Sequence, residues 1–272
     1  MTRSPLRRMM DVVTVMVVAI YLLPLLWIIL TAIKPTPDIN SLQPVWVFEP
    51  TLEHFAEGFN RFAFGRSLLD SSVVVIASTA ITMVLAVMCA YALARMKVRG
   101  ADTISLTILS LRFMPGVVVA MPYFLMFQGV HLLDTHFGLI AVYVGFGLPF
   151  AVWLMRGFLM DLPRDVEEAA RLDGLGWLQI LWSIIVPMAR SGLAVTTIFT
   201  FVFSWNEFLF AFYLTHTKVV TLPIQIFKMI DIYNVLWGPI SAAVLMQLAP
   251  MVLVVFILQR HIIRGLTLGA VK

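Results

Sequence analysis

The sequence predicts an all-α protein that crosses a membrane six times, and three observations support this prediction. Of the 272 residues, 61% are hydrophobic and 12% are charged, whereas a soluble domain has about 45–50% apolar and about 25% charged residues. The mean hydropathy is +0.95. The apolar residues also form six long runs, and a spanning helix needs about 20 such residues to cross about 30 Å of hydrocarbon. This composition excludes a water-soluble enzyme.

The six apolar runs are the predicted membrane helices. They cover residues 12–33, 71–94, 104–127, 137–155, 192–215 and 240–259. Four of them contain no Asp, Glu, Lys or Arg, while the third contains Arg112 and the fifth contains Glu207. Because membrane helices tolerate Gly and Pro, we expect these residues to kink the helices and not to end them. The residues concerned are Pro24, Pro115, Gly116, Pro122, Gly145, Gly147, Pro149 and Pro250.

The distribution of Lys and Arg predicts the orientation. When alternate connections are assigned to opposite sides, 13 of the 19 basic residues lie on one side and five on the other, and Arg112 is the remaining one. The positive-inside rule then places both termini in the cytoplasm. It places connections 34–70, 128–136 and 216–239 outside, and connections 95–103 and 156–191 inside. The net charge of +4 therefore reflects orientation, and no nucleic-acid partner is expected.

The 36-residue connection 156–191 has the pattern of a helix, a turn and a second helix. Asp161 and Pro163 suit the start of a helix. Gly174 suits its end, because glycine readily adopts the positive φ that commonly stops a helix. A second apolar helical stretch then reaches Pro187. We therefore expect this connection to fold against the cytoplasmic face of the protein.

The first of these two helices has a small and acidic surface. Ala169 and Ala170 allow a partner to approach closely, and Glu167 and Glu168 offer carboxylates that an arginine on the partner could bind. An interfacial helix with a solvated charged face is the alternative interpretation of the same pattern.

The motif in this loop resembles the EAA motif of permease subunits of ATP-binding-cassette (ABC) importers. The matching residues are Glu168, Ala169, Ala170, Gly174, Ile184, Val186 and Pro187, with Val186 where Leu is usual. Further segments are similar to the carbohydrate-uptake branch, specifically the maltose-type G-subunit. These segments are Met114-Pro115, 121–123, 132–135, 148–150, 204–209 and 264–272.

This resemblance implies the type I ABC importer permease fold, with six transmembrane helices, a cytoplasmic coupling helix, one membrane domain over residues 1–272 and a cytoplasmic tail at 260–272. It implies a bacterial-type plasma membrane location. The implied partners are a second, homologous permease chain, a dimer of cytoplasmic ATPases, an extracytoplasmic solute-binding protein and a sugar. The residues implied in coupling to the ATPase are Glu167, Glu168, Ala169, Ala170, Asp173 and Gly174.

No nucleotide site is expected in this chain. None of its five lysines is preceded by Gly and followed by Ser or Thr, so a Walker A loop is absent from the sequence. The resemblance implies that ATP and Mg²⁺ are bound by the partner ATPase, and that this chain needs no cofactor and is not itself an enzyme. The five histidines lie in or beside connections without metal-site spacing, so no metal site is expected.

Arg112, Asn206 and Glu207 are candidates for the solute path or for a gate, because a charge within a membrane helix is costly and often functional. A packing role, in which Glu207 pairs with Arg112 between helices, is the alternative. The segment Ser204–Leu209 resembles a signature shared by permeases of different sugars, which favours a structural or gating role over solute selectivity. At the level of the whole protein, a permease for another solute class and a membrane scaffold remain alternatives.

Overall fold

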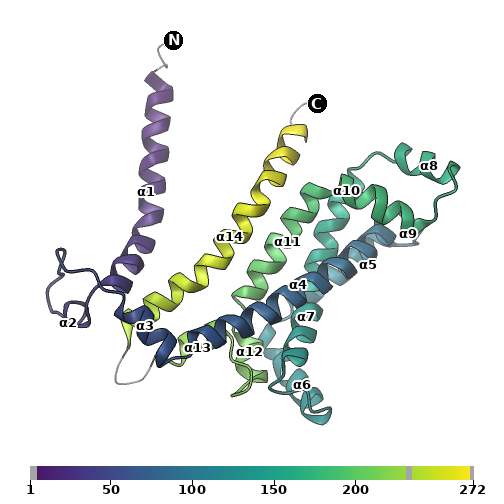
Figure 1. The fold of residues 1–272 in the computed structure, drawn as a ribbon. Coiled ribbons are helices and arrows are strands. Elements are labelled where there is room, and N and C mark those ends of the chain that lie inside the picture. The colour runs from purple at the N-terminus through teal and green to yellow at the C-terminus, as the bar shows by residue number, and fades with distance from the viewer. Residues whose placement is uncertain (1–4, 231–234, 270–272) are drawn as a thin grey trace. The chain divides into compact units, whose positions relative to one another are not determined.

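The computed structural model describes residues 5–230 and 235–269, and the regular elements in these residues are helices (Figure 1). They are α1 (Pro5–Ile33), α2 (Thr36–Ile39), α3 (Glu53–Asn60), α4 (Phe64–Arg95), α5 (Ala101–Ser110), the 3₁₀ turn η1 (Leu111–Phe113), α6 (Gly116–Gly129), α7 (His136–Met160), α8 (Asp165–Leu172), α9 (Trp177–Ile180), the π-helical turn η2 (Leu181–Ile185), α10 (Val186–Met188), α11 (Arg190–Trp205), α12 (Leu209–Leu214), α13 (Leu222–Phe227) and α14 (Trp237–Gly269).

Four helices of the described residues are long and apolar enough to cross a membrane, and they match four of the predicted spans. They are Met9–Ile33, Phe64–Arg95, His136–Met160 and Trp237–Arg260. Two further pairs of helices, each bent at a short break, raise the number of candidate spans to six. Because α14 continues to Gly269, the predicted tail at 260–272 is a helical extension as far as that residue. Residues 270–272 lie outside the described residues.

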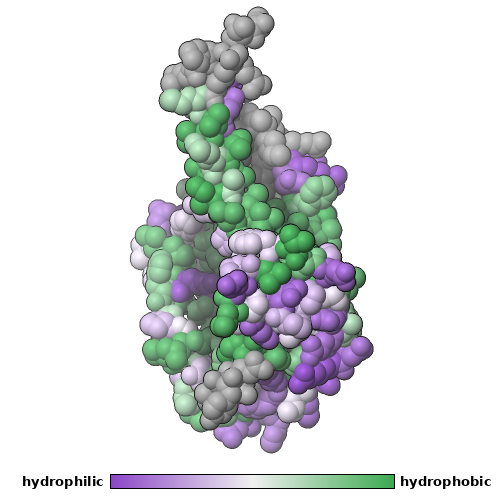
Figure 2. Space-filling view, turned by 90° about the vertical axis from the view of Figure 1, so that its left-hand side faces the viewer, coloured by the Kyte–Doolittle hydropathy of each residue, from purple (hydrophilic) through white to green (hydrophobic). Residues whose placement is uncertain are grey.

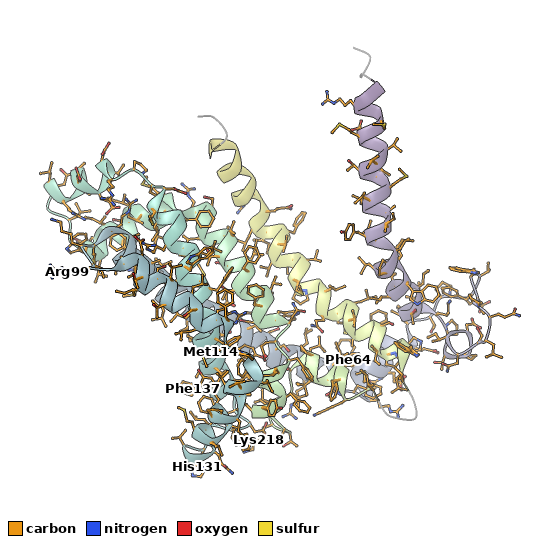
Figure 3. All side chains as sticks on the ribbon, turned by 180° about the vertical axis from the view of Figure 1, so that it is seen from behind. Phe64, Arg99, Met114, His131, Phe137 and Lys218 are labelled. Atoms are coloured by element: carbon orange, nitrogen blue, oxygen red, sulfur yellow. The ribbon has the colours of Figure 1, made fainter. Side chains whose placement is uncertain are left out.

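The predicted span 104–127 is not one kinked helix. It consists of α5 with η1, followed by α6, and the two parts meet at an angle of 88°. Met114, which lies at this bend (Figure 3), is extended, with φ −64° and ψ 130°. The ring of Pro115 disfavours the helical conformation in the residue before it and removes a backbone N–H group. The expectation that proline only kinks the helices is wrong here, although α1, α6, α7 and α14 each continue through a proline.

The predicted span 192–215 is also interrupted. Helix α11 ends at Trp205 and α12 begins at Leu209. At its other end, α11 meets the helical stretch Trp177–Met188 at an angle of 84°. The 16 residues of α11 cover only about 24 Å at about 1.5 Å per residue. By itself, α11 is therefore shorter than the hydrocarbon core of about 30 Å.

The described residues form two compact units. One contains residues 5–65 and 225–249 without the gap at 231–234, and the other contains residues 66–224 and 250–269. We call them the small unit and the large unit. The prediction of a single membrane domain stays a prediction.

In the small unit, α1 has apolar side chains all round its surface, and Figure 2 shows this hydrophobic surface on one face. A helix that is apolar on every side is typical of a membrane span. Beyond its end, the buried Lys34 donates a hydrogen bond of 2.7 Å to the carbonyl oxygen of Val45. Its ammonium group also lies 5.0 Å from the ring centre of Phe48. These contacts order the segment that follows α1.

The large unit has an apolar core at each end. One core joins α4, α6, α7, α11 and α12 around Tyr143, Trp205 and Phe210. The other joins α4 and α7 to the loop helices α8 and α9 around Tyr91 and Leu159. The long helices α4 and α7 contribute to both cores, so they position the two ends of the unit relative to each other.

One carboxylate holds the segment 216–219 in the large unit. Asp134 adopts a positive φ of 56°, and its two oxygens accept backbone N–H groups of His216, Thr217, Lys218 and Val219 at 2.9–3.1 Å. Burial raises the pKa of the Asp134 carboxyl, but the four N–H donors together lower it by more than burial raises it. Its pKa therefore lies well below its usual range. The ionised carboxylate is therefore a structural part of this loop.

The first prediction concerns Asp134. We expect Asp134→Asn to lower stability by about 1–3 kcal/mol, because it weakens several charge-assisted hydrogen bonds. A carboxyl whose pKa is lowered on folding stabilises the folded protein at pH values above its unfolded pKa of about 3.9. This stabilisation is lost as the pH falls below that value. The thermal midpoint of the purified protein should therefore fall at all pH values between about 5 and 8. The exposed Asp161→Asn is the control, and equal midpoints for both variants would contradict the prediction.

Candidate functional site

The loop between α7 and α11 contains a sharp turn after α8. Gly174 has a φ of +86°, its N–H donates to the carbonyl of Arg171 at 3.0 Å, and the N–H of Leu175 donates to the carbonyl of Ala170 at 3.1 Å. This pair of bonds is the Schellman motif, in which glycine is favoured because a side chain is strained at positive φ. The predicted helix end at Gly174 is confirmed.

The start of α8 differs from the prediction. The helix begins at Asp165, and Arg164 at its N-cap makes no side-chain hydrogen bond to the helix. Asp161 instead occupies the C-cap of α7. The prediction that Asp161 and Pro163 open the helix is therefore wrong by a few residues. The second predicted helix is present as α9, η2 and α10, and Pro187 lies inside it rather than at its end.

Helix α8 divides the EAA residues between two faces. Glu167 and Ala170 are buried, being 3% and 5% exposed. Glu168, Ala169 and Asp173 are exposed. Neighbouring residues on a helix point about 100° apart, so the two adjacent glutamates have different surroundings. The interpretation that Glu167 offers its carboxylate to a partner is wrong, because that carboxylate faces the interior of this chain.

The buried carboxylate of Glu167 pairs with Arg95 at the end of α4. The Arg95 Nε lies 2.9 Å from the Glu167 Oε1, and the two side chains are 2% and 4% exposed. The Tyr91 hydroxyl donates to the Glu167 Oε2 at 3.3 Å. Arg95 also donates through Nη2 to the carbonyl of Leu162 at 2.7 Å. Sequence reasoning missed this pair, because it treated Arg95 only as one of the charges that set orientation.

The outward face of the loop also has apolar groups. Leu172 is 90% exposed at the end of α8, and Leu178 is 62% exposed on α9. Arg171 lies over the ring of Trp177 at 3.8 Å. The exposed surface therefore combines the Glu168 carboxylate with protruding apolar side chains, which is suited to a partner with a basic and partly apolar groove.

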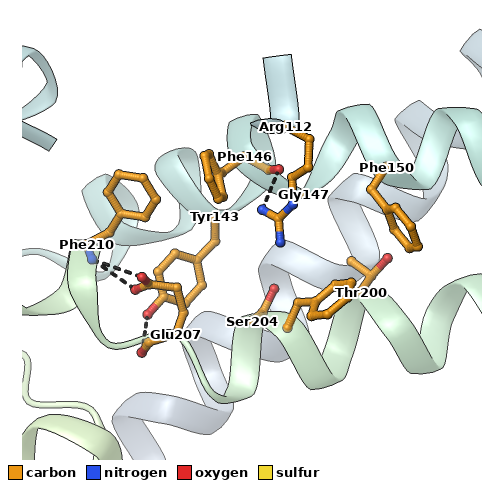
Figure 4. Close-up of a pocket in the computed structure, with 10 residues that line it drawn as sticks. Arg112, Tyr143, Phe146, Gly147, Phe150, Thr200, Ser204, Glu207 and Phe210 are labelled. Atoms are coloured by element: carbon orange, nitrogen blue, oxygen red, sulfur yellow. Dashed lines mark hydrogen bonds between the residues drawn. The ribbon is translucent and has the colours of Figure 1, made fainter. Parts of the chain in front are cut away.

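A second candidate site is a cavity of about 210 Å³ in the large unit (Figure 4). Its lining residues come from η1, α7, α11 and α12, and from the break between α11 and α12. They are Arg112, Tyr143, Phe146, Gly147, Phe150, Thr200, Phe203, Ser204, Glu207 and Phe210. Aromatic faces, three hydroxyl groups, one guanidinium and one carboxylate therefore surround the same space. A volume below the roughly 300–1,000 Å³ of ligand pockets suits part of a solute path more than a complete binding site.

Glu207 caps a helix at the edge of this cavity. It lies in the break between α11 and α12, and not within a helix as predicted. Its carboxylate accepts the backbone N–H of Phe210 at 3.0 and 3.1 Å and that of Ala211 at 3.3 Å. A negative charge is favourable at a helix N-terminus, where N–H groups lack partners.

Arg112 stabilises a different part of the cavity wall. Its guanidinium donates to the carbonyl of Phe146 at 3.1 Å and lies over the rings of Phe146 and Phe203 at 4.3 and 5.3 Å. A direct ion pair between Arg112 and Glu207, the alternative considered from the sequence, is not observed among the described residues. The structure brings Arg112 and Glu207 to one cavity.

Asn206 lies beside the cavity but does not line it. Its Nδ2 donates to the carbonyl of Val202 at 2.8 Å, back along α11. Thr200, which sequence reasoning did not select, lines the cavity, and its buried hydroxyl has no hydrogen-bond partner among the described residues. No sequence signal distinguishes Thr200 from the other hydroxyl residues of α11.

The second prediction concerns Glu207. We expect Glu207→Gln to lower the thermal stability of the assembled protein by about 0.5–2 kcal/mol, because it removes the charge that caps α12. The thermal midpoint and the yield of assembled protein measure this, with Glu49→Gln as a control that removes an exposed carboxylate away from the cavity. Normal stability combined with a selective loss of solute binding would contradict the structural role.

Comparisons with known proteins agree on one family. The family model described as "Binding-protein-dependent transport system inner membrane component" matches residues 82–268. The chain is 36% identical over 253 residues to the probable ABC transporter permease protein y4oR of Sinorhizobium fredii, covering 93% of this chain and 91% of that protein. It is 35% identical over 266 residues to the trehalose transport system permease protein SugB of Mycobacterium tuberculosis, covering 96% of each.

A chain in the crystal structure of a bacterial ABC transporter involved in the import of the acidic polysaccharide alginate has the same fold. The TM-score is 0.75 at 23% identity, and the match covers 96% of this chain and 99% of that chain. Since the family model matches well over half of the sequence, this chain belongs to the family of inner membrane components of binding-protein-dependent transport systems.

Proposed function

We propose that this chain is the transmembrane permease subunit of an ATP-driven carbohydrate importer. It forms half of the translocation path together with a second, homologous permease chain. A dimer of cytoplasmic ATPases supplies the energy by hydrolysing ATP, and an extracytoplasmic binding protein delivers the sugar. The family match and the similarity to a trehalose permease support this proposal.

The outward face of α8 is the observation on which the proposal depends most. Its exposed Glu168, Ala169 and Leu172 form a short surface that a groove on an ATPase can receive. The Gly174 turn and the apolar core beneath α8 fix this surface relative to α4 and α7. Movement of the ATPase can therefore displace the membrane helices and not only the loop.

The cavity contributes the chain's part of the solute path. Aromatic side chains such as Phe150 and Phe203 offer faces on which a sugar ring can stack, while Thr200, Ser204 and Arg112 offer hydrogen-bonding groups. Because Glu207 is held by the N-terminus of α12, we assign it to the shape of the path and not to solute recognition. The small volume of the cavity is consistent with a path that the second permease chain completes.

The third prediction concerns orientation. We propose that both termini are cytoplasmic and that residues 34–70 lie outside, because most basic loop residues fall on the opposite side. Asn60→Cys in a Cys89→Ala background should then react with a membrane-impermeant maleimide in intact cells, since Asn60 is exposed. Reaction only after permeabilisation would reverse the assignment.

The fourth prediction concerns coupling to the ATPase. Glu168→Lys reverses the charge on the outward face of α8, and Gly174→Asp places a side chain at positive φ. We expect each variant to insert into the membrane normally but to lower ATP-dependent uptake by at least about tenfold. This factor corresponds to about 1.4 kcal/mol of coupling free energy. Uptake of the carbohydrate that the cognate binding protein retains is compared with ATP hydrolysis by the purified importer.

Glu49→Lys is the matched control, because it reverses an exposed carboxylate outside the loop. Normal uptake in both loop variants would refute the proposed role of α8. A binding protein that retains a solute other than a carbohydrate would refute the proposed substrate class.

A further inference from the structure

Helix α4 is, with α7, one of the two long unbroken helices of the large unit, and it makes polar contacts with both the coupling loop and the segment 218–222. Its 32 residues extend about 48 Å at about 1.5 Å per residue. By contrast, α5 with α6, and α10 with α11, are bent by more than 80°. In Figure 3, Arg99 marks the region just beyond one end of α4, and Lys218 lies toward the other end.

At the first end, α8 is tied to α4 through buried charges. Glu167 of α8 pairs with Arg95, the last residue of α4, at 2.9 Å, and both side chains are almost completely buried. Arg95 also binds the carbonyl of Leu162, in the connection that leads into α8. Because a buried charge is costly without its partner, this contact strongly favours one position of α8 on α4.

At the second end, α4 holds the segment 218–222. The buried Asp70 accepts the N–H of Val220 at 3.0 Å and contacts His136 Nε2 at 2.8 Å. The hydroxyl of Ser71 accepts the N–H of Leu222 at 2.8 Å. Arg66 donates to the carbonyl of Lys218 at 2.8 Å. Two successive turns of α4 therefore bind the backbone of this segment.

We propose that α4 is a connecting helix that transmits the position of α8 to the segment 218–222 on the other side of the membrane. Arg95 and Glu167 are positioning residues at one end, and Asp70 is the corresponding residue at the other. The proposal rests on the proposed function and deepens it, because it assigns a route between the ATPase and the outer face, where the binding protein delivers its solute. A helix fixed by buried polar contacts at both ends can move as one body, whereas a helix bent in the middle can absorb movement.

The test uses the complete importer reconstituted in vesicles, with Lys218→Cys in a Cys89→Ala background as a reporter. The rate of reaction at position 218 with a membrane-impermeant maleimide is measured with and without ATP and Mg²⁺. In the otherwise unchanged importer we expect ATP to change this rate by at least about fivefold, the lower end of typical coupling between sites. Uptake is measured in the same preparation.

The decisive variant is the double change Arg95→Gln with Glu167→Gln. It removes both charges of the pair, so no unpaired charge stays buried, and the chain should still assemble with the ATPase. We expect it to lose the ATP-dependent change at position 218 and to lose uptake in parallel. Because the two residues act as one pair, the double variant should be no more impaired than either single variant.

Asp102→Asn is the matched control, since it removes an exposed carboxylate from an ion pair with Arg156, near the same end of the unit. It should keep the ATP-dependent change. Asp70→Asn should lose the change at position 218 while the ATPase stays bound, and this second variant tests the proposal without altering the loop. Retention of the change in the Arg95→Gln, Glu167→Gln double variant or in Asp70→Asn would overturn the proposal.

The outcomes distinguish this proposal from the proposed function. If Glu168→Lys and Gly174→Asp both leave uptake normal, the role of α8 in coupling fails. Those two variants can instead lose uptake while the double variant and Asp70→Asn keep the ATP-dependent change at position 218. In that case α8 is coupled to the outer face by another route, and only the role of α4 is wrong.

Discussion

Backbone N–H and C=O groups have no water to bind in the hydrocarbon core, so every break in a membrane helix must be satisfied from within the protein. This chain has few charged residues, and two of them lie at such breaks. Glu207 accepts the free N–H groups at the start of α12. Arg112, beside the bend before α6, donates to a carbonyl of α7. In the connection between α6 and α7, Asp134 likewise accepts four backbone N–H groups.

The same constraint explains how the candidate path is formed. The break between α11 and α12 and the bend between α5 and α6 bring polar groups to one cavity, where an unbroken helix would present mainly apolar side chains. The aromatic rings around Arg112 stabilise its charge through contacts with their faces. The polar cavity therefore results from the irregular backbone, and the charges that line it also stabilise that irregularity.

Hydropathy was enough to predict the spans with regular helices, because their apolar runs coincide with single helices. The breaks were harder to predict. Pro149 lies within a continuous helix, whereas Pro115 follows a helix end at which Met114 is extended. The EAA spacing located the loop, and Gly174 marked its turn correctly. The buried partner of Glu167 could not be predicted, since it depends on how α8 lies against α4.

The two adjacent glutamates of α8 constrain how the loop can change in evolution. Glu167 faces Arg95 in the interior, whereas Glu168 faces outward, and this division depends on the helical phase set by the residues before α8. A one-residue insertion or deletion within α8, before Glu167, rotates Glu167 by about 100° relative to the start of the helix, which turns its carboxylate away from Arg95. Single substitutions on the outward face leave this phase intact. The number of residues between the start of α8 and Glu167 is therefore expected to stay constant among related chains.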